Sequence, residues 1–366
     1  MKAERIAQVY AEPGPFASAY VEVSKDQTDG DRVAGLQARA AADLLAEQGA
    51  PESVVELVRE RLSESTHLPA PVSRLVVANQ AGVLLDELTR RHVPQPTAVW
   101  DALPDISAWL TDEDSSVPFV LALVDHEGGD VQTYRTSAFT PDADTTVGGD
   151  TEFEHKIRGG GWAHLRYQHH VENTWRSNAA DVVHEIERQV AEGVAVVLLA
   201  GDPQSCQQVK AMIGDIRAEL IHLETGGRNA DGGEEALQSA VDQALYSTVV
   251  AAKLAEVHEL KERLGRDYAV AIGVGDVADA FVRGQVERLL IDPNAAAGFQ
   301  VEPERHPGLV LAANGEAPPA VPADRALIAA AALTSADVVV TRSSTLGGAP
   351  VAALLRWDQT AVGSTA

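Results

Sequence analysis

The sequence predicts an α/β protein of several domains, in which mixed sheets are flanked by helices. Two continuous apolar runs, Val194–Ala200 and Val286–Ile291, have the pattern of strands buried on both faces. Segments with helical periodicity, Asn173–Glu192 and Glu234–Leu264, lie around the first of these runs. With 366 residues, the chain is long enough for two or three domains that each bury a core.

The first predicted domain covers residues 1–145 and mixes strands with two helices. Strands are expected where β-prone residues alternate or cluster, at Phe16–Val23, Arg74–Asn79, Gly82–Leu85, Val117–Val124 and Val131–Tyr134. The helices are expected at Asp31–Gln48, which Gly49 ends, and at Pro51–Leu62. The segment Thr140–Asp150 is rich in Pro, Gly, Thr and Asp and has no apolar period, which predicts a linker to the next domain.

Two further domains are predicted, a central one at residues 151–265 and a C-terminal one at residues 266–366. In the central domain, a further helix is expected at Gln204–Met212 and a further strand at Leu220–Leu223. Both lie between the apolar run Val194–Ala200 and the long helix Glu234–Leu264. In the C-terminal domain, helices are expected at Asp276–Arg283 and Ala323–Thr334, and strands at Val286–Ile291, Val338–Thr341 and Val351–Leu355.

The composition excludes several classes of protein. The formal net charge is -25, which argues against non-specific binding of nucleic acid. Cys206 is the one cysteine, so the chain forms no internal disulfide and has no Cys/His zinc spacing. The sequence has no run of about 18 apolar residues, so no membrane-spanning helix is predicted. Its first residues also have no apolar core of the kind found in signal peptides. A cytoplasmic location without membrane association is therefore expected.

One stretch, His155–Asn178, reverses the charge of the chain. The stretch contains four basic residues and one acidic residue, so its formal net charge is four minus one, or +3. The basic residues are Lys156, Arg158, Arg166 and Arg176, and the acidic residue is Glu172. The stretch also contains aromatic residues and three consecutive glycines. This combination suits an RNA surface, because guanidinium groups bind phosphate, rings stack on bases, and bare backbone allows close approach. The alternative is a solvated loop between domains.

The histidines of this stretch do not have the spacing of metal ligands. His169 and His170 are adjacent, so on a helix they would point about 100° apart. His164 is five residues from His169, which is off the i, i+4 face. We therefore expect no metal site and interpret these residues as surface histidines that hydrogen-bond phosphate or stack near RNA. No catalytic residue is predicted, and Cys206 is interpreted as a small buried hydrophobe.

A nucleotide site is the alternative that a second motif raises. Gly273, Gly275 and Ala278 match the dinucleotide fingerprint G-x-G-x-x-A, and Asp292 ends the following strand. Such a motif would hold pyrophosphate at a helix N-terminus and would make the protein a nucleotide-dependent enzyme. The other interpretation is an ordinary turn before a helix, and on that interpretation no cofactor is expected.

Three short motifs in the basic stretch resemble the start of the central domain in the archaeo-eukaryotic release factor and Pelota superfamily. They are Gly159-Gly160-Gly161-Trp162, Leu165-Arg166-Tyr167-Gln168 and Glu172-Asn173. The resemblance is closer to the bacterial branch, which includes the Balon-type ribosome hibernation factors, and it implies a three-domain release-factor-like architecture. True release factors carry a Gly-Gly-Gln loop at this place. Here Trp162 follows the glycines and the nearest glutamine is Gln168, so the departure argues against peptidyl-tRNA hydrolysis.

The resemblance implies a hibernation factor that occupies the A site of idle 70S ribosomes under stress and reaches toward the peptidyl transferase centre. It implies ribosomal RNA as a partner, and also the elongation GTPase that delivers aminoacyl-tRNA. The expected RNA-binding residues are Lys156, Arg158, Gly159, Gly160, Gly161, Trp162, His164, Arg166, Tyr167, Gln168, His169, His170 and Arg176. The alternative within the family is a release or rescue factor, in which Gly160, Gly161 and Gln168 would position the attacking water.

Overall fold

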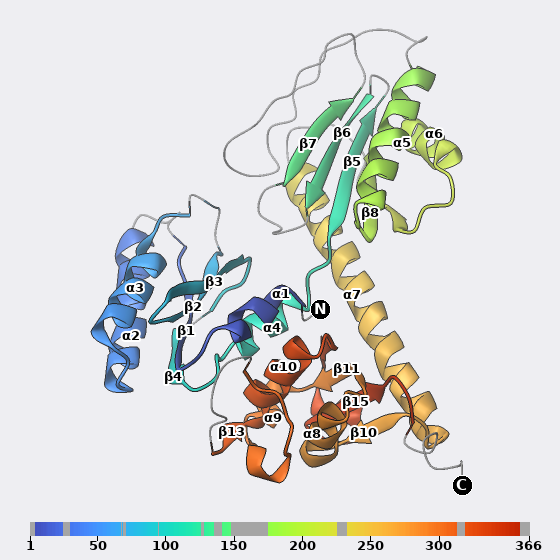
Figure 1. The fold of residues 1–366 in the computed structure, drawn as a ribbon. Coiled ribbons are helices and arrows are strands. Elements are labelled where there is room, and N and C mark those ends of the chain that lie inside the picture. The colour runs from blue at the N-terminus through green and yellow to red at the C-terminus, as the bar shows by residue number, and fades with distance from the viewer. Residues whose placement is uncertain are drawn as a thin grey trace. The chain divides into compact units, whose positions relative to one another are not determined.

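The computed structural model describes residues 4–24, 30–66, 68, 71–93, 95–125, 128–134, 141–147, 175–224, 233–312 and 319–358. The chain divides into two compact units (Figure 1). Unit 1 combines residues 1–66, 70–115 and 251–366, and unit 2 combines residues 67–69 and 116–250. In the described part of the chain, no helix has both the length and the apolar character that a membrane crossing needs.

Unit 1 begins with an antiparallel sheet of four strands in the order β3-β2-β1-β4. The strands are β1 (Phe16–Glu22), β2 (Ser73–Asn79), β3 (Gly82–Thr89) and β4 (Thr97–Asp101). Between β1 and β2 the chain forms two helices, α2 (Gly30–Glu47) and α3 (Glu52–Ser63), which pack side by side against the sheet. The short helices of this part are α1 (Glu4–Ala7), η1 (Gln8–Ala11) and α4 (Ser107–Glu113).

The second sheet of unit 1 has the order β10-β15-β11-β14. Its strands are β10 (Val270–Ile272), β11 (Val286–Ile291), β14 (Asp337–Val340) and β15 (Val351–Leu355). Strand β11 is parallel to β14, whereas β10 and β11 are both antiparallel to β15. The other elements of this part are α8 (Val274–Val282), α9 (Pro293–Ala296), β12 (Gln300–Val301), η2 (Pro303–Arg305), β13 (Val321–Pro322), α10 (Ala323–Leu333) and η3 (Ser343–Leu346).

The two sheets of unit 1 share one apolar core. Tyr10 and Trp109 from the first part are fully buried in the same cluster as Phe281 and Leu327 from the second. Polar contacts accompany this core, since the Ser107 hydroxyl donates to the Asp324 carboxylate (2.7 Å). Further contacts between the two parts are Arg325 with Asp101 and Asp105, Lys253 with Asp114, and the Val340 N–H donated to Asp114.

Unit 2 is a mixed sheet of five strands in the order β7-β6-β5-β8-β9. Its strands are β5 (Phe119–Asp125), β6 (Gly128–Tyr134), β7 (Ala143–Val147), β8 (Val196–Gly201) and β9 (Glu219–His222). Strands β5, β8 and β9 are parallel, and β6 is antiparallel to both β5 and β7. The central strands β5 and β8 are almost fully buried, as their continuous apolar sequences predict.

Helices cover both faces of this sheet. On one face, α5 (Trp175–Ala191) and α6 (Pro203–Met212) pack through Val182, Ile186 and Val209. On the other face, the first half of α7 (Gly233–Gly265) packs through Leu237 and Val241. The second half of α7 belongs to unit 1, where Leu260 packs with Leu290 and Leu354. The predicted α/β class, with mixed sheets flanked by helices, is confirmed.

The predicted boundary near residues 145–151 differs from the observed division. The strands predicted at Val117–Val124 and Val131–Tyr134 belong to the first predicted domain. In the structure they form β5 and β6, and β5 pairs in parallel with β8, so residues 116–147 belong to unit 2. The predicted linker Thr140–Asp150 also contains a strand, because β7 pairs with β6 from Gly129↔Val147 to Thr133↔Ala143. Residues 266–366 belong to the same unit as residues 1–66 and 70–115, and the two parts share a core.

Candidate functional site

The RNA-binding residues predicted from the sequence lie outside the described residues. Lys156, Arg158, Gly159, Gly160, Gly161, Trp162, His164, Arg166, Tyr167, Gln168, His169 and His170 all belong to residues 148–174. Arg176 lies in the first turn of α5, where the backbone but not the side chain is described. Their assignment stays a prediction, but the structure describes the two points between which this segment runs.

The segment 148–174 leaves the sheet at the carboxyl ends of its parallel strands. Val147, the last residue of β7, is paired with Gly129 of β6. Gly129 is paired with Val124 near the end of β5, and Val124 is paired with Gly201 at the end of β8. Because β6 is antiparallel to both neighbours, β7 runs in the same direction as β5 and ends at the same edge. We call this the carboxyl edge of unit 2, defined by Val147, Asp125 and Gly201.

The chain returns at the same edge, because α5 starts over it. Ala179 and Val182, in the first two turns of α5, line a hollow together with Val124 and Gly128. The backbone of β6 lies so close that a Cβ atom on Gly129 would meet the Val182 side chain at 3.1 Å. Both ends of segment 148–174 therefore belong to one small region of one sheet.

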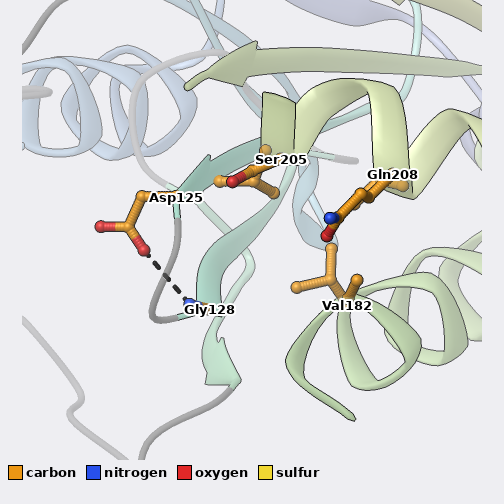
Figure 2. A pocket seen from close by; sticks show the side chains of 8 residues that line it. Asp125, Gly128, Val182, Ser205 and Gln208 are labelled. Atoms are coloured by element: carbon orange, nitrogen blue, oxygen red, sulfur yellow. Dashed lines mark hydrogen bonds between the residues drawn. The ribbon is translucent and has the colours of Figure 1, made fainter. Parts of the chain in front are cut away.

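The hollow at the carboxyl edge is small and mixed in polarity (Figure 2). Its lining comes from the ends of β5 and β6 and from helices α5 and α6, and consists of Val124, Asp125, Gly128, Ala179, Val182, Ser205, Gln208 and Val209. The Asp125 carboxylate accepts a hydrogen bond from the Gly128 N–H (3.1 Å), which joins the end of β5 to the start of β6. This bond fixes the strand ends at the site where segment 148–174 is attached.

Helix α6 begins at the carboxyl edge with a polar cap. The Asp202 carboxylate accepts from the Ser205 N–H (2.8 Å) and from the Ser205 hydroxyl (3.0 Å), and Pro203 occupies the first helical turn. The Ser205 hydroxyl is thus directed at a capping carboxylate, which is a structural arrangement. Next to it, burial raises the pKa of the Cys206 thiol to about 11, so Cys206 is a buried hydrophobe as the sequence predicts.

Glycine is required where β5 and β8 meet this edge. Gly201 has a φ of 122°, and a Cβ atom there would lie 2.0 Å from the carbonyl oxygen of Val124. A side chain at this position would push β8 away from β5, so the bare backbone is what lets the parallel strands end side by side. The sequence signal for this feature is the Gly201-Asp202-Pro203 turn directly after an apolar run.

Two aspartates stabilise the β6–β7 pair that leads to the segment. The Thr146 hydroxyl donates to Asp130 (2.7 Å), and the Gln132 amide lies 3.4 Å from Asp144. Burial raises the pKa of both the Asp130 and the Asp144 carboxyl groups. Sequence reasoning missed these residues, because Asp and Thr in β7 resemble a linker until the pairing with β6 is known.

The dinucleotide motif lies between strands β10 and β11, which run in the same direction but are separated in the sheet by the antiparallel strand β15. Strand β10, before Gly273, pairs antiparallel with β15, and β11 pairs with the other side of β15. The Asp292 carboxylate accepts from the Ala295 N–H (3.1 Å) and the Ser343 N–H (2.8 Å), which cap α9 and hold η3. These contacts favour the interpretation as an ordinary turn before α8. Among the described residues, no group of three or more His, Cys, Asp and Glu side chains is arranged to hold a metal ion.

Comparison with known proteins identifies relatives for this chain. Residues 118–266 match the model of bacterial archaeo-eukaryotic release factor family 2. Two uncharacterized proteins of Mycobacterium tuberculosis, MT2704 from strain CDC 1551 / Oshkosh and Rv2629 from strain H37Rv, are 24% identical to the chain over 295 residues. That alignment covers 80% of this chain and 78% of each relative.

Two solved structures are similar to this chain over most of its length. Archaeal Pelota, in a model of its ribosome-bound form with ABCE1, is 16% identical with a TM-score of 0.42, over 98% of this chain and 96% of that chain. Dom34 of S. cerevisiae, a translation termination-like factor that interacts with Hbs1, is 9% identical with a TM-score of 0.41. The alignment with Dom34 covers 97% of this chain and 92% of that chain.

The matched region contains nearly all of unit 2 and also the second half of α7, which belongs to unit 1. It begins one residue before β5 and ends one residue after α7, so it contains the whole sheet of unit 2, its covering helices and the segment 148–174. The motifs Gly159–Trp162 and Leu165–Gln168 lie inside it. Through residues 118–266, the chain is similar to bacterial archaeo-eukaryotic release factor family 2.

Proposed function

We propose that this protein binds idle 70S ribosomes, occupies their A site and reaches toward the peptidyl transferase centre without hydrolysing peptidyl-tRNA. The observation that carries the proposal is the placement of the +3 stretch, His155–Asn178. Most of it lies between β7 and α5, which both meet the carboxyl edge, inside the region that matches the release factor family. A basic, aromatic segment held at one edge of such a domain is suited to enter an RNA site.

The residues of the segment would contribute to RNA binding in different ways, according to the chemistry of their side chains. Arg158 and Arg166 would hold phosphate groups, and Trp162 and Tyr167 would stack on exposed bases. Gly159–Gly161 would let the backbone approach RNA where side chains would clash. The formal charge of -25 does not oppose this local binding, because at physiological salt charges are screened over about 8–10 Å.

The proposal of a silent factor depends on the residue that follows the glycines. Release factors have glutamine at this place, whereas this chain has Trp162. A tryptophan indole stacks and donates one hydrogen bond, but it does not offer the amide with which glutamine would orient a water molecule. The proposed action is therefore hibernation, in which the factor protects or silences the ribosome during stress.

The second candidate function is release or rescue of the nascent chain. The match of residues 118–266 to the release factor family supports it, and Gly160, Gly161 and Gln168 are the residues that would position the attacking water. Peptide release from a stalled ribosome complex separates the two candidates. We expect no release above the rate of a reaction without the factor, and release that depends on Gln168 would replace the first candidate with the second.

Ribosome binding itself is tested by cosedimentation of the protein with vacant 70S ribosomes. We expect pelleting at low salt that weakens as salt rises, because contacts with phosphate release counterions. Because the proposed partners include the elongation GTPase that delivers aminoacyl-tRNA, the assay is run with and without it in the GTP state. Absence of pelleting at low salt under both conditions would overturn the proposal.

A further inference from the structure

Helix α7 belongs to both units, because the division of the chain passes through it between Val250 and Ala251 (Figure 1). Its first half packs on the sheet of unit 2, and its second half packs in unit 1. In the middle, from Tyr246 to Glu256, every residue is described and none is buried. Most helices in proteins depend on the packing of one face for their stability, so this stretch relies largely on its own sequence.

Two polar contacts mark the limits of the part of α7 that each unit holds. In unit 2, the Thr248 hydroxyl donates to the Glu219 carboxylate of β9 (3.1 Å). In unit 1, the Lys253 ammonium pairs with the carboxylate of Asp114, at the C-terminal end of α4 (3.1 Å). Between these contacts lie the apolar residues 249–252, whose side chains form no hydrogen bonds to either unit.

The sequence of α7 is least favourable to a helix at the same place. Ser247, Thr248, Val249 and Val250 are consecutive, and serine and β-branched residues form helices less readily than alanine or leucine. Elsewhere in α7 such residues occur only singly. The Ser247 hydroxyl also donates to the carbonyl of Gln243 one turn earlier (2.8 Å), a contact that competes with the helical hydrogen bond to that carbonyl.

The second half of α7 is reinforced in a way that the middle is not. Arg263 pairs with Glu259 (2.5 Å) at the i, i+4 spacing that stabilises a helix, and a second pair of this kind follows three residues later. The one basic residue of the stretch 246–256 is Lys253, and it pairs with α4 instead of with another residue of α7. The middle of the helix therefore has neither core packing nor an ion pair along its own surface.

We propose that α7 contains a joint at Ser247–Val250, where the helix opens for short times while both of its ends stay folded. Opening at this place breaks a few backbone hydrogen bonds and exposes no buried side chain, whereas opening of either packed half would expose a core. The joint lies where the chain passes from one unit to the other. It lets the unit that carries the carboxyl edge turn independently of unit 1.

Hydrogen exchange of the full chain, measured amide by amide, tests the opening. The amides of residues 247–254 should exchange at least tenfold faster than those of the packed halves, because their hydrogen bonds start or end at the joint. The triple variant Ser247→Ala, Val249→Ala and Val250→Ala should slow this exchange about tenfold, since alanine is the strongest helix former. Ala251→Gly should quicken it about fivefold, because glycine weakens a helix.

The matched controls lie in the packed first half of α7. Ser239→Ala and Ala236→Gly make the same changes of side chain as Ser247→Ala and Ala251→Gly, also at exposed positions. They should leave the exchange of residues 247–254 unchanged. Central amides that exchange as slowly as those of the packed halves would overturn the proposal, as would central amides that respond equally to the controls.

A second measurement asks whether the opening reorients the units. Gln80→Cys in unit 1 and Glu187→Cys in unit 2 place spin labels at two exposed positions, and the distribution of distances between the labels is recorded. Cys206 is buried and takes no label. The distribution should be broad, should narrow in the triple alanine variant and should widen in Ala251→Gly.

A single narrow distribution that none of these variants changes would show that α7 is a rigid connection, and the proposal would then fail. Neither measurement contains ribosomes, so its result is independent of the proposed ribosome binding.

Discussion

The side chain of Gln48 forms hydrogen bonds with the backbone of strand β4 at Trp100 and Ala98, as a neighbouring strand would. The Trp100 N–H donates to the Gln48 side-chain carbonyl at 2.9 Å, and the Gln48 amide donates to the carbonyl of Ala98 at 2.9 Å. Strand β4 is the last strand of its sheet, and its other side pairs with β1. Gln48 therefore satisfies backbone groups that an edge strand would otherwise leave open for pairing with another chain.

Replacing Gln48 by alanine should destabilise unit 1 by about 1–2 kcal/mol, because the two hydrogen bonds to β4 are lost together with the bond to the carbonyl of Leu44. Urea unfolding followed by circular dichroism measures this change. The control is Gln80→Ala, at the exposed turn between β2 and β3, which should change stability by no more than about 0.5 kcal/mol. Equal effects of the two substitutions would show that the pairing of Gln48 with β4 contributes nothing.

Asp324 should make unit 1 less stable as pH rises. The residue is 3% exposed, and burial raises the pKa of its carboxyl group, with Asp105 adding to the rise and Ser107 and Arg325 opposing it. A carboxyl group with a raised pKa favours the folded state when protonated. That contribution is complete below the ordinary pKa of aspartate, about 4, and is lost as pH rises through the raised value.

The variant Asp324→Asn isolates this effect, because asparagine stays neutral. Other carboxyl groups, such as Asp86, have a lowered pKa and act in the opposite direction, so the informative quantity is the difference between variant and wild type. The free energy of unfolding of the variant, relative to wild type, should rise with pH above about 4. Glu60→Gln is the exposed control. A difference that does not change with pH would contradict the assignment.

The double substitution Arg166→Glu with Trp162→Ala should abolish ribosome binding and leave the fold intact. Loss of an arginine–phosphate contact and of a stacked ring should each cost about 1–3 kcal/mol. Together they lower affinity by two or more decades, at about 1.4 kcal/mol per decade. Ribosome pelleting and a melting curve are measured on the same protein.

The matched control for this pair is Lys210→Glu with Tyr268→Ala, which reverses an exposed charge and removes an exposed ring outside the segment. It should pellet as wild type does. A large fall in the melting temperature of the first variant would mean that Trp162 is a core residue. Unchanged pelleting together with an unchanged melt would place the RNA-binding site on other residues.

The dinucleotide motif should bind no nucleotide. NAD and ATP should produce no heat of binding in calorimetry and no shift in melting temperature. Gly275→Val should fold, because a Cβ atom at Gly275 meets nothing within 4 Å. Micromolar binding of either nucleotide that Gly275→Val removes would show that the turn before α8 is a nucleotide site after all.

The sequence was most informative where periodicity is strong. The apolar runs became β8 and β11, and the periodic segments became α5 and α7, with ends displaced by a few residues at most. A strand that is buried on both faces has a continuous apolar sequence, and a long helix that is buried on one face has apolar residues at helical spacing. Both patterns can be recognised from the local sequence alone. The burial of Cys206 was also predictable from local sequence, and in α6 it is buried together with Ser205 and Val209.

Elements that depend on distant partners were not predictable in this way. Strand β7 contains Asp144, Thr145 and Thr146, and it is a strand because β6 supplies hydrogen bonds to it. Strand β4 has one sheet neighbour, with Gln48 on its outer side, so little of its sequence shows burial. The division into two units also depends on distant partners, since the parallel pairing of β5 with β8 joins segments that are far apart in the chain.

Because β7 ends and α5 begins at the carboxyl edge of one sheet, the spacing of these two attachment points is set by strand pairing and helix packing, not by the residues between them. Exchange of those residues for others would leave the register of β5, β6 and β8 unchanged. The same scaffold can therefore present a segment that cleaves, one that only binds, or one that fits another RNA surface. Evolution would need to alter a single contiguous stretch of the gene to convert one kind of factor into another.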